Sequence, residues 1–371
     1  MRTPLRTTLV TVAVLALAAV GGPAAAAPAG APTGQSGPAA PSAPSAPAIP
    51  VFTDGYGLTQ VPGATEVHSA TDFTITVTTP QVSGPHKIRV FLPSGYAADP
   101  DKRWPVTYFL HGGGGTVNDA AAAPALRSDK MITVVPDGGL KGWYADWVMQ
   151  NTAEGAANWE TFHLTQVVPF IDANLRTIPD RDHRAVVGLS MGGFGSLHYA
   201  EARPDLFGHV AALSGGIDFG MWQIRAAVLA TELNLPGAWC AVSTSGSGQC
   251  VGYGPYVDSD AIFGSPYPVF NADRVWKAVD PAAPANLAKL AGTGITLYTG
   301  DNDVIDAHTA AASKTVKARL DGLGIPSRLV AYGNGASLAP TCNGGHNYGC
   351  WGPALADYVP RLEAAFAAAG S

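Results

Sequence analysis

A serine between two glycines is the first candidate for chemistry in this chain of 371 residues. Gly188, Ser190 and Gly192 fit the pattern Gly-x-Ser-x-Gly. Because the chain contains 44 glycines, chance alone makes this pattern a weak signal. Its context is more specific, since a short apolar run at 185–187 precedes it and a plausible helix start follows. A sharp turn from strand to helix lifts a serine hydroxyl above a sheet, so we expect Ser190 to be a nucleophile.

A serine hydroxyl needs a base to take its proton and a carboxylate to orient that base. His346 lies in a glycine-containing segment between the last predicted strand and the last predicted helix, and we assign it as the base. The acid should follow the strand before it, where Asp301, Asp303 and Asp306 cluster. Asp303 is the preferred acid, Asp301 the second choice and Asp306 the third. A calcium loop is the alternative, but the cluster lacks the glycine and distal glutamate of an EF-hand.

Four consecutive glycines, residues 112–115, follow the predicted strand at 106–110. Glycines there let backbone N–H groups approach the oxyanion of a tetrahedral intermediate. A phosphate-binding loop is disfavoured because no Lys-Ser/Thr pair follows the glycines. His111, which precedes them, is interpreted as structural. Trp143 and Tyr144 follow another strand end, where they would either wall an acyl or sugar pocket or pack in the core.

These candidates need a scaffold, and the apolar periodicity supplies one. Short apolar or alternating runs predict strands at 73–79, 87–92, 106–110, 132–135, 185–187, 209–213, 295–298 and 328–331. Helical spacing predicts helices at 164–175, 221–235, 307–323 and 353–368. The alternation favours a mostly parallel α/β sheet with helices on both faces, whose ligand sites lie beyond the carboxyl ends of the strands. Residues 221–271 interrupt this alternation of strands and helices. They form either a cap over the pocket or a segment that lies on the protein surface.

Together these residues resemble the esterase D and mycolyltransferase branch of the α/β-hydrolases, over roughly residues 73–362. The resemblance rests on the Ser190 motif, on Trp143-Tyr-Ala-Asp-Trp147, on Asn158-Trp-Glu-Thr-Phe162, on Asp280-Pro281, and on Gly345-His346 with Trp351-Gly352. It implies an α/β-hydrolase fold and a triad of Ser190, His346 and an acid best matched at Asp303. It also implies that the backbone amides of Gly113 and Met191 form the oxyanion hole.

One departure from the family pattern bears on the reaction. Mycolyltransferases carry an aspartate and, three residues later, an arginine in the loop that engages a trehalose acceptor. This sequence has His111 and Gly114 at those positions. The departure favours an ordinary esterase whose acceptor is water over transfer of a mycoloyl group to trehalose.

The N-terminal residues predict export. Residues 1–27 combine two arginines, a short apolar run and an Ala-rich exit, which is typical of a cleaved secretory signal. The apolar run is too short to favour the alternative of an uncleaved anchor. Residues 28–50 are almost entirely Ala, Pro, Gly and Ser and are interpreted as a linker, followed by a single catalytic domain at 51–371.

Cysteine usage agrees with an oxidising compartment. Among the three possible connectivities we favour the local pairs Cys240–Cys250 and Cys342–Cys350. Zinc binding is disfavoured because the spacings are wide and no Cys-x-x-Cys motif occurs.

The composition limits the partners. Charged residues make up 13% of the chain and the net charge is −6, which provides no basic field for nucleic acid or anionic lipid. We expect a secreted serine esterase acting on a small or polymeric ester, with no cofactor, no metal and no stable membrane insertion. The oligomeric state is left open. The alternatives are an acyltransferase that uses a sugar or glycerol hydroxyl, and a non-catalytic exported binding protein.

Overall fold

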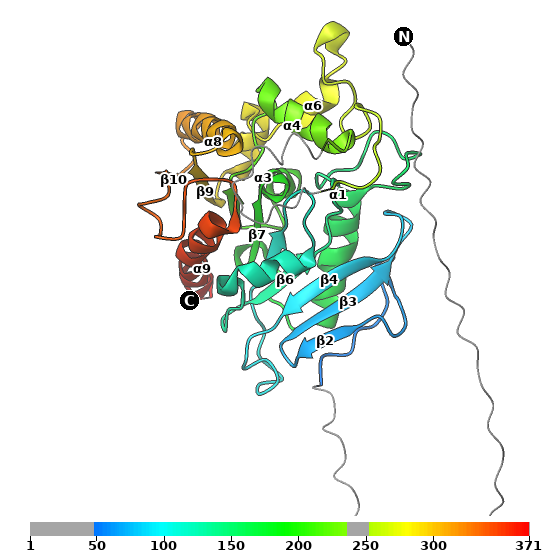
Figure 1. Cartoon of the computed structure of the whole chain (residues 1–371). Coiled ribbons are helices and arrows are strands. Elements are labelled where there is room, and N and C mark those ends of the chain that lie inside the picture. The colour runs from blue at the N-terminus through cyan, green and yellow to red at the C-terminus, as the bar shows by residue number, and fades with distance from the viewer. Residues whose placement is uncertain (1–47, 236–251, 371) are drawn as a thin grey trace, which may run out of the picture. The chain divides into compact units, whose positions relative to one another are not determined.

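The first strands of the sheet are antiparallel. The computed structural model describes residues 48–235 and 252–370. Within them, β1 (Thr59–Gln60) and β2 (Glu66–Ser69) each pair with β3 (Asp72–Thr78), which pairs with β4 (His86–Phe91). β4 then pairs in antiparallel fashion with β6 (Ile132–Pro136). The strands β2, β3 and β4 lie side by side at one end of the sheet, in blue to cyan in Figure 1.

The remaining strands are parallel and complete the sheet in the order β1-β3-β4-β6-β5-β7-β8-β9-β10. They are β5 (Val106–Leu110), β7 (Arg184–Leu189), β8 (His209–Leu213), β9 (Gly294–Gly300) and β10 (Ser327–Gly333). Every strand predicted from apolar periodicity is present, with bounds within two residues of the prediction, while β1 and β2 were not predicted. Because the parallel strands run the same way, the loops after β5, β7, β8, β9 and β10 meet at one edge.

Successive strand residues point to opposite faces and build two hydrophobic cores. Val186 belongs to one core and Val187 to the other. The first core is covered by helical segments that contribute buried residues to it: α1 (Trp159–Thr161), the π-helical η3 (Phe162–Val167), α2 (Val168–Asn174), α3 (Met191–Ala202), α4 (Trp222–Glu232) and α8 (Val304–Gly322). The second is covered by η1 (Val117–Ala122), η2 (Pro124–Leu126) and α9 (Tyr348–Ala369). Helices on both faces therefore position the loops at the carboxyl edge (Figure 1).

Shorter helices fill the connections. These are η4 (Arg181–His183), η5 (Val269–Asn271), α6 (Arg274–Val279), α7 (Pro284–Leu287) and η6 (Ala288–Leu290). None was predicted, because three to six residues are too few to display a helical period. None of the described helices is both long and apolar enough to cross a membrane.

Two sequence predictions lie outside the described residues. The signal at 1–27 is one, together with nearly all of the linker at 28–50; the other is the Cys240–Cys250 pair. Within the described part, Ile49 already packs against the first core and Phe52 is buried in it. Residues slightly before 51 therefore also pack against the first core.

Candidate active site

Ser190 stands at the turn between β7 and α3, in a backbone conformation that non-glycine residues rarely adopt. Its φ is 55° and its ψ is −119°. The turn is held by hydrogen bonds from Ser190 N to Leu213 O on β8 and from Gly193 N to Ser190 O. This strained geometry places the hydroxyl at the carboxyl edge of the sheet, as the motif predicts.

The glycines of the motif are required because the backbone approaches itself closely there. A Cβ added to Gly188 would lie 2.0 Å from Gly192 O, and one added to Gly192 would lie 2.1 Å from Leu110 O. No side chain can occupy either space. The serine turn is therefore fixed by backbone packing, locally between β7 and α3 at Gly188 and against the end of β5 at Gly192.

His346 connects Ser190 to a buried carboxylate. Its Nε2 lies 2.8 Å from Ser190 Oγ, and its Nδ1 lies 2.7 Å from Asp306 Oδ1. Asp306 is fully buried in the first turn of α8. The resulting chain runs from hydroxyl to imidazole to carboxylate and has the connectivity of a serine-hydrolase triad.

Asp306, and not Asp303, faces the imidazole, so the preferred acid was wrong. Asp303 is the N-cap of α8: its Oδ1 accepts from Asp306 N at 2.7 Å and its Oδ2 accepts from His346 N at 2.6 Å. It thus holds the backbone of the base while Asp306 holds the ring. Asp301 is exposed, and neither of its carboxylate oxygens is bonded to His346 in the described structure.

The carboxylate of Asp306 is itself held in place. Ser214, which follows β8 and has a φ of 46°, donates from Oγ to Asp306 Oδ2 at 3.1 Å. Thr309 donates to Asp306 Oδ1 at 3.2 Å. These contacts were not predicted, although a polar residue directly after a buried parallel strand is a signal that could have identified Ser214.

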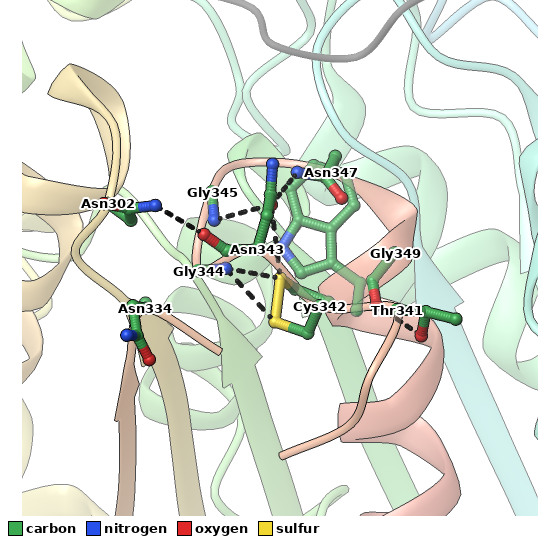
Figure 2. The surroundings of a disulfide bond; sticks show 12 residues. Asn302, Asn334, Thr341, Cys342, Asn343, Gly344, Gly345, Asn347 and Gly349 are labelled. Atoms are coloured by element: carbon green, nitrogen blue, oxygen red, sulfur yellow. Dashed lines mark hydrogen bonds between the residues drawn. A yellow bond between two sulfur atoms is a disulfide. The ribbon is translucent and has the colours of Figure 1, made fainter. Parts of the chain in front are cut away.

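The loop that carries His346 is closed by the Cys342–Cys350 disulfide, as predicted. Figure 2 shows the Gly344 amide directed at the two sulfurs, and the Asn343 side chain accepting from the Gly345 amide. Asn302, which precedes α8, donates to Asn343 O at 2.7 Å. The loop is therefore tied both to itself and to the segment that carries Asp306.

The glycine loop after β5 lies against the nucleophile. A Cβ on Gly112 would be 3.4 Å from Ser190 Cβ, so the loop backbone passes directly beside the serine. Gly114 N donates to Leu140 O and Gly115 N to Gly112 O. Gly113 lines the same cavity as Ser190 and Met191. Met191 is the first residue of α3, where amides have no acceptor within the helix.

The side chain of His111 forms hydrogen bonds that hold the backbone of this loop. Gly138 N donates to its Nε2 at 2.9 Å, which leaves Nδ1 to donate to Gly112 O at 2.8 Å. The imidazole is fully buried, in keeping with the structural role expected of it.

Trp143 and Tyr144 differ in position although they are adjacent. Trp143 lines the cavity, and its Nε1 donates to Thr231 Oγ1 of α4 at 2.9 Å. Tyr144 is fully buried behind the glycine loop, where its hydroxyl donates to His111 O at 2.9 Å. Burial raises the pKa of Tyr144 well above its ordinary value. Tyr144 does not line the cavity, so the structure contradicts its prediction as a substrate-binding residue.

A cavity of about 950 Å³ opens over Ser190. Part of its wall comes from α4, where Gln223, Ala226, Ala227 and Ala230 share one helix face. Tyr253 contributes a further aromatic wall near Gly113, and burial raises its pKa to about 12. The segment 221–271 therefore contributes to the pocket through both α4 and Tyr253.

The sequence of the chain matches an enzyme family along most of its length. A family model described as "Putative esterase" matches residues 79–362. Two esterases from strains of Mycobacterium tuberculosis are 32% identical over 248 residues, which cover 64% of this chain and 50% of each relative. The matched chain thus spans about half the length of these relatives. The diacylglycerol acyltransferase/mycolyltransferase Ag85B of Mycolicibacterium smegmatis is 25% identical over 293 residues, covering 76% of this chain and 78% of the relative.

Solved structures share the fold. The crystal structure of Mycobacterium tuberculosis MPT51 superposes with a TM-score of 0.58 at 19% identity, covering 78% of this chain and 97% of that chain. An S-formylglutathione hydrolase from Agrobacterium tumefaciens gives 0.56 at 13% identity, covering 85% and 98%. The predicted α/β-hydrolase fold is confirmed, as is the resemblance to the esterase and mycolyltransferase branch.

Proposed function

This chain belongs to the esterase family whose model matches residues 79–362, and we propose that it is a serine esterase that hydrolyses carboxylic esters through an acyl-enzyme on Ser190. The observation that carries the proposal is the unbroken hydrogen-bond chain from Ser190 through His346 to Asp306, lying beside a large cavity. The family match supports an esterase, and this chain of contacts supports the chemistry assigned to each residue.

In the first half of the reaction, His346 Nε2 takes the proton of Ser190 Oγ as the oxygen attacks the ester carbonyl. Asp306 holds the imidazole through Nδ1 and stabilises the positive charge that develops on the ring. The carbonyl oxygen becomes an oxyanion that accepts hydrogen bonds from the amides of Gly113 and Met191. The tetrahedral intermediate then collapses, His346 donates its proton to the alcohol oxygen, and the alcohol leaves.

In the second half, water replaces the alcohol. His346 takes a proton from the water as it attacks the acyl carbon, and the same two amides stabilise the second tetrahedral intermediate. Collapse breaks the bond to Ser190 Oγ, which recovers a proton from His346. The products are a carboxylic acid and the regenerated serine.

Acyl transfer to a sugar or glycerol hydroxyl is the second candidate. It is favoured by the relative named as a diacylglycerol acyltransferase/mycolyltransferase. The absence of the aspartate and arginine pattern, with His111 and Gly114 in its place, favours water as the acceptor. Product analysis with glycerol present separates the two, because transfer faster than hydrolysis would overturn the choice of water. A non-catalytic binding protein is disfavoured because all three polar groups are in contact.

We further propose that the enzyme is secreted. Residues 1–27 have the pattern of a secretory signal. The Cys342–Cys350 disulfide supports an oxidising compartment.

Labelling and mutation of Ser190 test the function together. A fluorophosphonate should modify one peptide, the one that contains Ser190, and Ser190→Ala should lower kcat on p-nitrophenyl butyrate by about 10,000-fold or more. Ser259→Ala is the matched control, because Ser259 is exposed and lies outside the cavity lining. Unchanged hydrolysis by Ser190→Ala would contradict the proposed function.

A further inference from the structure

Trp351 is in contact with both members of the pair formed by His346 and Asp306. It lies in the first turn of α9, next to Cys350 of the disulfide. Its ring packs almost perpendicular to the His346 imidazole, with the ring centroids 4.8 Å apart. Its Nε1 lies 3.2 Å from Ser214 Oγ, and that oxygen lies 3.1 Å from Asp306 Oδ2. One side chain thus touches the base directly and reaches the acid through a single serine.

The chemistry of these groups fixes which of them donates. An indole N–H donates and cannot accept, so Ser214 Oγ is the acceptor in its hydrogen bond with Trp351. An ionised carboxylate only accepts, so the single proton of Ser214 is donated to Asp306 Oδ2. The indole therefore restricts the rotation of the serine hydroxyl to orientations in which its proton points at the acid.

The backbone of Ser214 indicates that its hydroxyl has a use. Ser214 follows β8 with a φ of 46°, a left-handed conformation that glycine adopts more readily. Glycine at this position would relieve the strain but would remove the hydroxyl. Strained non-glycine residues are concentrated at functional sites, where the surrounding structure holds them. Here Ser214 is fully buried, and its backbone N donates to Tyr298 O at 2.7 Å.

The carboxylate of Asp306 depends on this donor. Asp306 is fully buried, and His346 is its only ion-pair partner among the described residues. Its Oδ1 interacts with His346 and Thr309, whereas Ser214 is the one described residue that donates to Oδ2. A buried carboxylate oxygen without a donor is costly. If the Ser214 hydroxyl turned away, the carboxylate would be less firmly held opposite the imidazole.

A second buried hydroxyl lies close to this group. Burial raises the pKa of Tyr332 on β10, and the charge of Asp306 raises it further. The Tyr332 oxygen nevertheless has no hydrogen-bond partner within residues 48–235 and 252–370. The indole of Trp351, and not this phenol, is therefore the side chain that donates to Ser214 Oγ.

We propose that Trp351 is a positioning residue that acts through Ser214: its indole N–H orients the serine hydroxyl, which holds the Asp306 carboxylate against His346. The proposal rests on the serine-esterase function above and adds two residues to the hydrogen-bond chain behind the triad. Trp351 also lines the cavity, so a test of the hydrogen bond has to keep the shape of its ring.

Replacing only the N–H of the indole tests the proposal. Benzothienylalanine incorporated in place of Trp351 keeps the bicyclic ring and puts sulfur where the N–H was, so the packing against His346 is retained. We expect kcat on p-nitrophenyl butyrate to fall about fivefold with KM unchanged, which is the usual worth of a neutral hydrogen bond. Ser214→Ala should lower kcat about tenfold, because it removes a hydrogen bond to a charged group.

Combining the two changes distinguishes a relay from two independent contacts. If the indole acts through Ser214, the double variant should lose about tenfold, no more than Ser214→Ala alone. Independent contributions would multiply to a loss of about fiftyfold, and that result would overturn the proposal. An unchanged kcat with benzothienylalanine in place of Trp351 would overturn it as well.

Two further variants serve as matched controls. Trp276 is fully buried in α6, donates from Nε1 to Gly264 O at 2.8 Å and lies outside the cavity lining. Benzothienylalanine in place of Trp276 should leave kcat unchanged, and so should Tyr332→Phe. If Tyr332→Phe lowered kcat as much as the change at Trp351, the orienting donor would be the phenol and the proposal would be overturned.

The wild-type protein separates this proposal from the esterase function. A wild type that neither hydrolyses the ester nor reacts with a fluorophosphonate at Ser190 would overturn the esterase function itself. An active wild type whose kcat is insensitive to the change at Trp351 would overturn only the role assigned to the indole.

Discussion

The turn that carries Ser190 and the loop that carries His346 are held by different means. The serine turn is constrained by backbone that leaves no room for side chains, as at Gly188 and Gly192. The histidine loop is constrained by side chains distant in the sequence, with Asp303 bonded to the backbone of His346 and Asp306 to its ring. A disulfide closes the same loop. The first depends on close packing of backbone against backbone, and the second depends on how α8 and α9 pack.

This difference implies different responses to mutation. A change in the serine turn should act first on folding, because a clash between backbone segments cannot be relieved by moving a side chain. A change around the histidine loop should act first on catalysis, because the fold can persist while the imidazole loses its orientation.

The largest effect on rate should come from Asp306. Replacing it with Asn keeps the size of the side chain but removes the charge that orients the imidazole, so Asp306→Asn should lower kcat about 10,000-fold. Asp303→Asn should lower it far less, because Asp303 contacts only backbone amides. Steady-state hydrolysis of p-nitrophenyl butyrate measures both, and a larger loss for Asp303→Asn would reverse the assignment.

A substitution in the serine turn should act mainly by lowering the free energy of unfolding. A Cβ at Gly188 would lie 2.0 Å from Gly192 O, so Gly188→Ala should cost more than about 4 kcal/mol of unfolding free energy. Urea denaturation followed by tryptophan fluorescence measures the change. Gly322→Ala is the control, since a Cβ there meets open space at the end of α8. A Gly188→Ala protein as stable as wild type would contradict the steric account of the turn.

Removing the disulfide that closes the histidine loop should have an intermediate effect on stability. The Cys342–Cys350 bond closes a short loop with a sequence separation of 8, for which chain entropy gives about 2.5 kcal/mol of stability. The double variant Cys342→Ala with Cys350→Ala should lose about this much and react more slowly with a fluorophosphonate, because His346 is less well held. If labelling of Ser190 were unaffected while stability fell, the disulfide would support the fold and not the base.

The smallest effect should come from Asp303 as a helix cap. Asp303→Ala removes the acceptor for the Asp306 amide and should cost about 1 kcal/mol of unfolding free energy. Asp303→Asn should recover the part of that stability due to the cap, because its side-chain oxygen can still accept from Asp306 N, whereas its amide nitrogen cannot accept from His346 N. Thermal unfolding of the two variants side by side makes the comparison, and equal losses would argue against capping.

Much of the scaffold could be predicted from periodicity alone. The eight predicted strands are present, as are the four predicted helical regions, and Cys342–Cys350 is bonded. Ser190 and His346 could be paired from motif and chain order, and the structure brings them into contact. The short strands β1 and β2 could not be predicted, because two to four residues carry too little pattern.

The misassigned acid has a specific cause. The predicted helix began at 307, which left residues 301–306 as a loop in which three aspartates were equivalent. In the structure α8 begins at Val304, so Asp303 becomes its cap and Asp306 lies in its first turn. An aspartate followed three residues later by another acid, just before a helical pattern, resembles a capping box and could have shifted the prediction.

By itself, the sequence indicated the serine turn through its motif, and the clash that excludes a side chain at Gly188 involves backbone only four residues away, at Gly192. Only the tertiary structure decided which carboxylate faces His346 and which of Trp143 and Tyr144 lines the cavity. Adjacent residues point in different directions, and a helix that starts three residues earlier turns a different side chain toward its neighbour. Those directions depend on how α8, α9 and the glycine loop pack at the sheet edge, which no local pattern records.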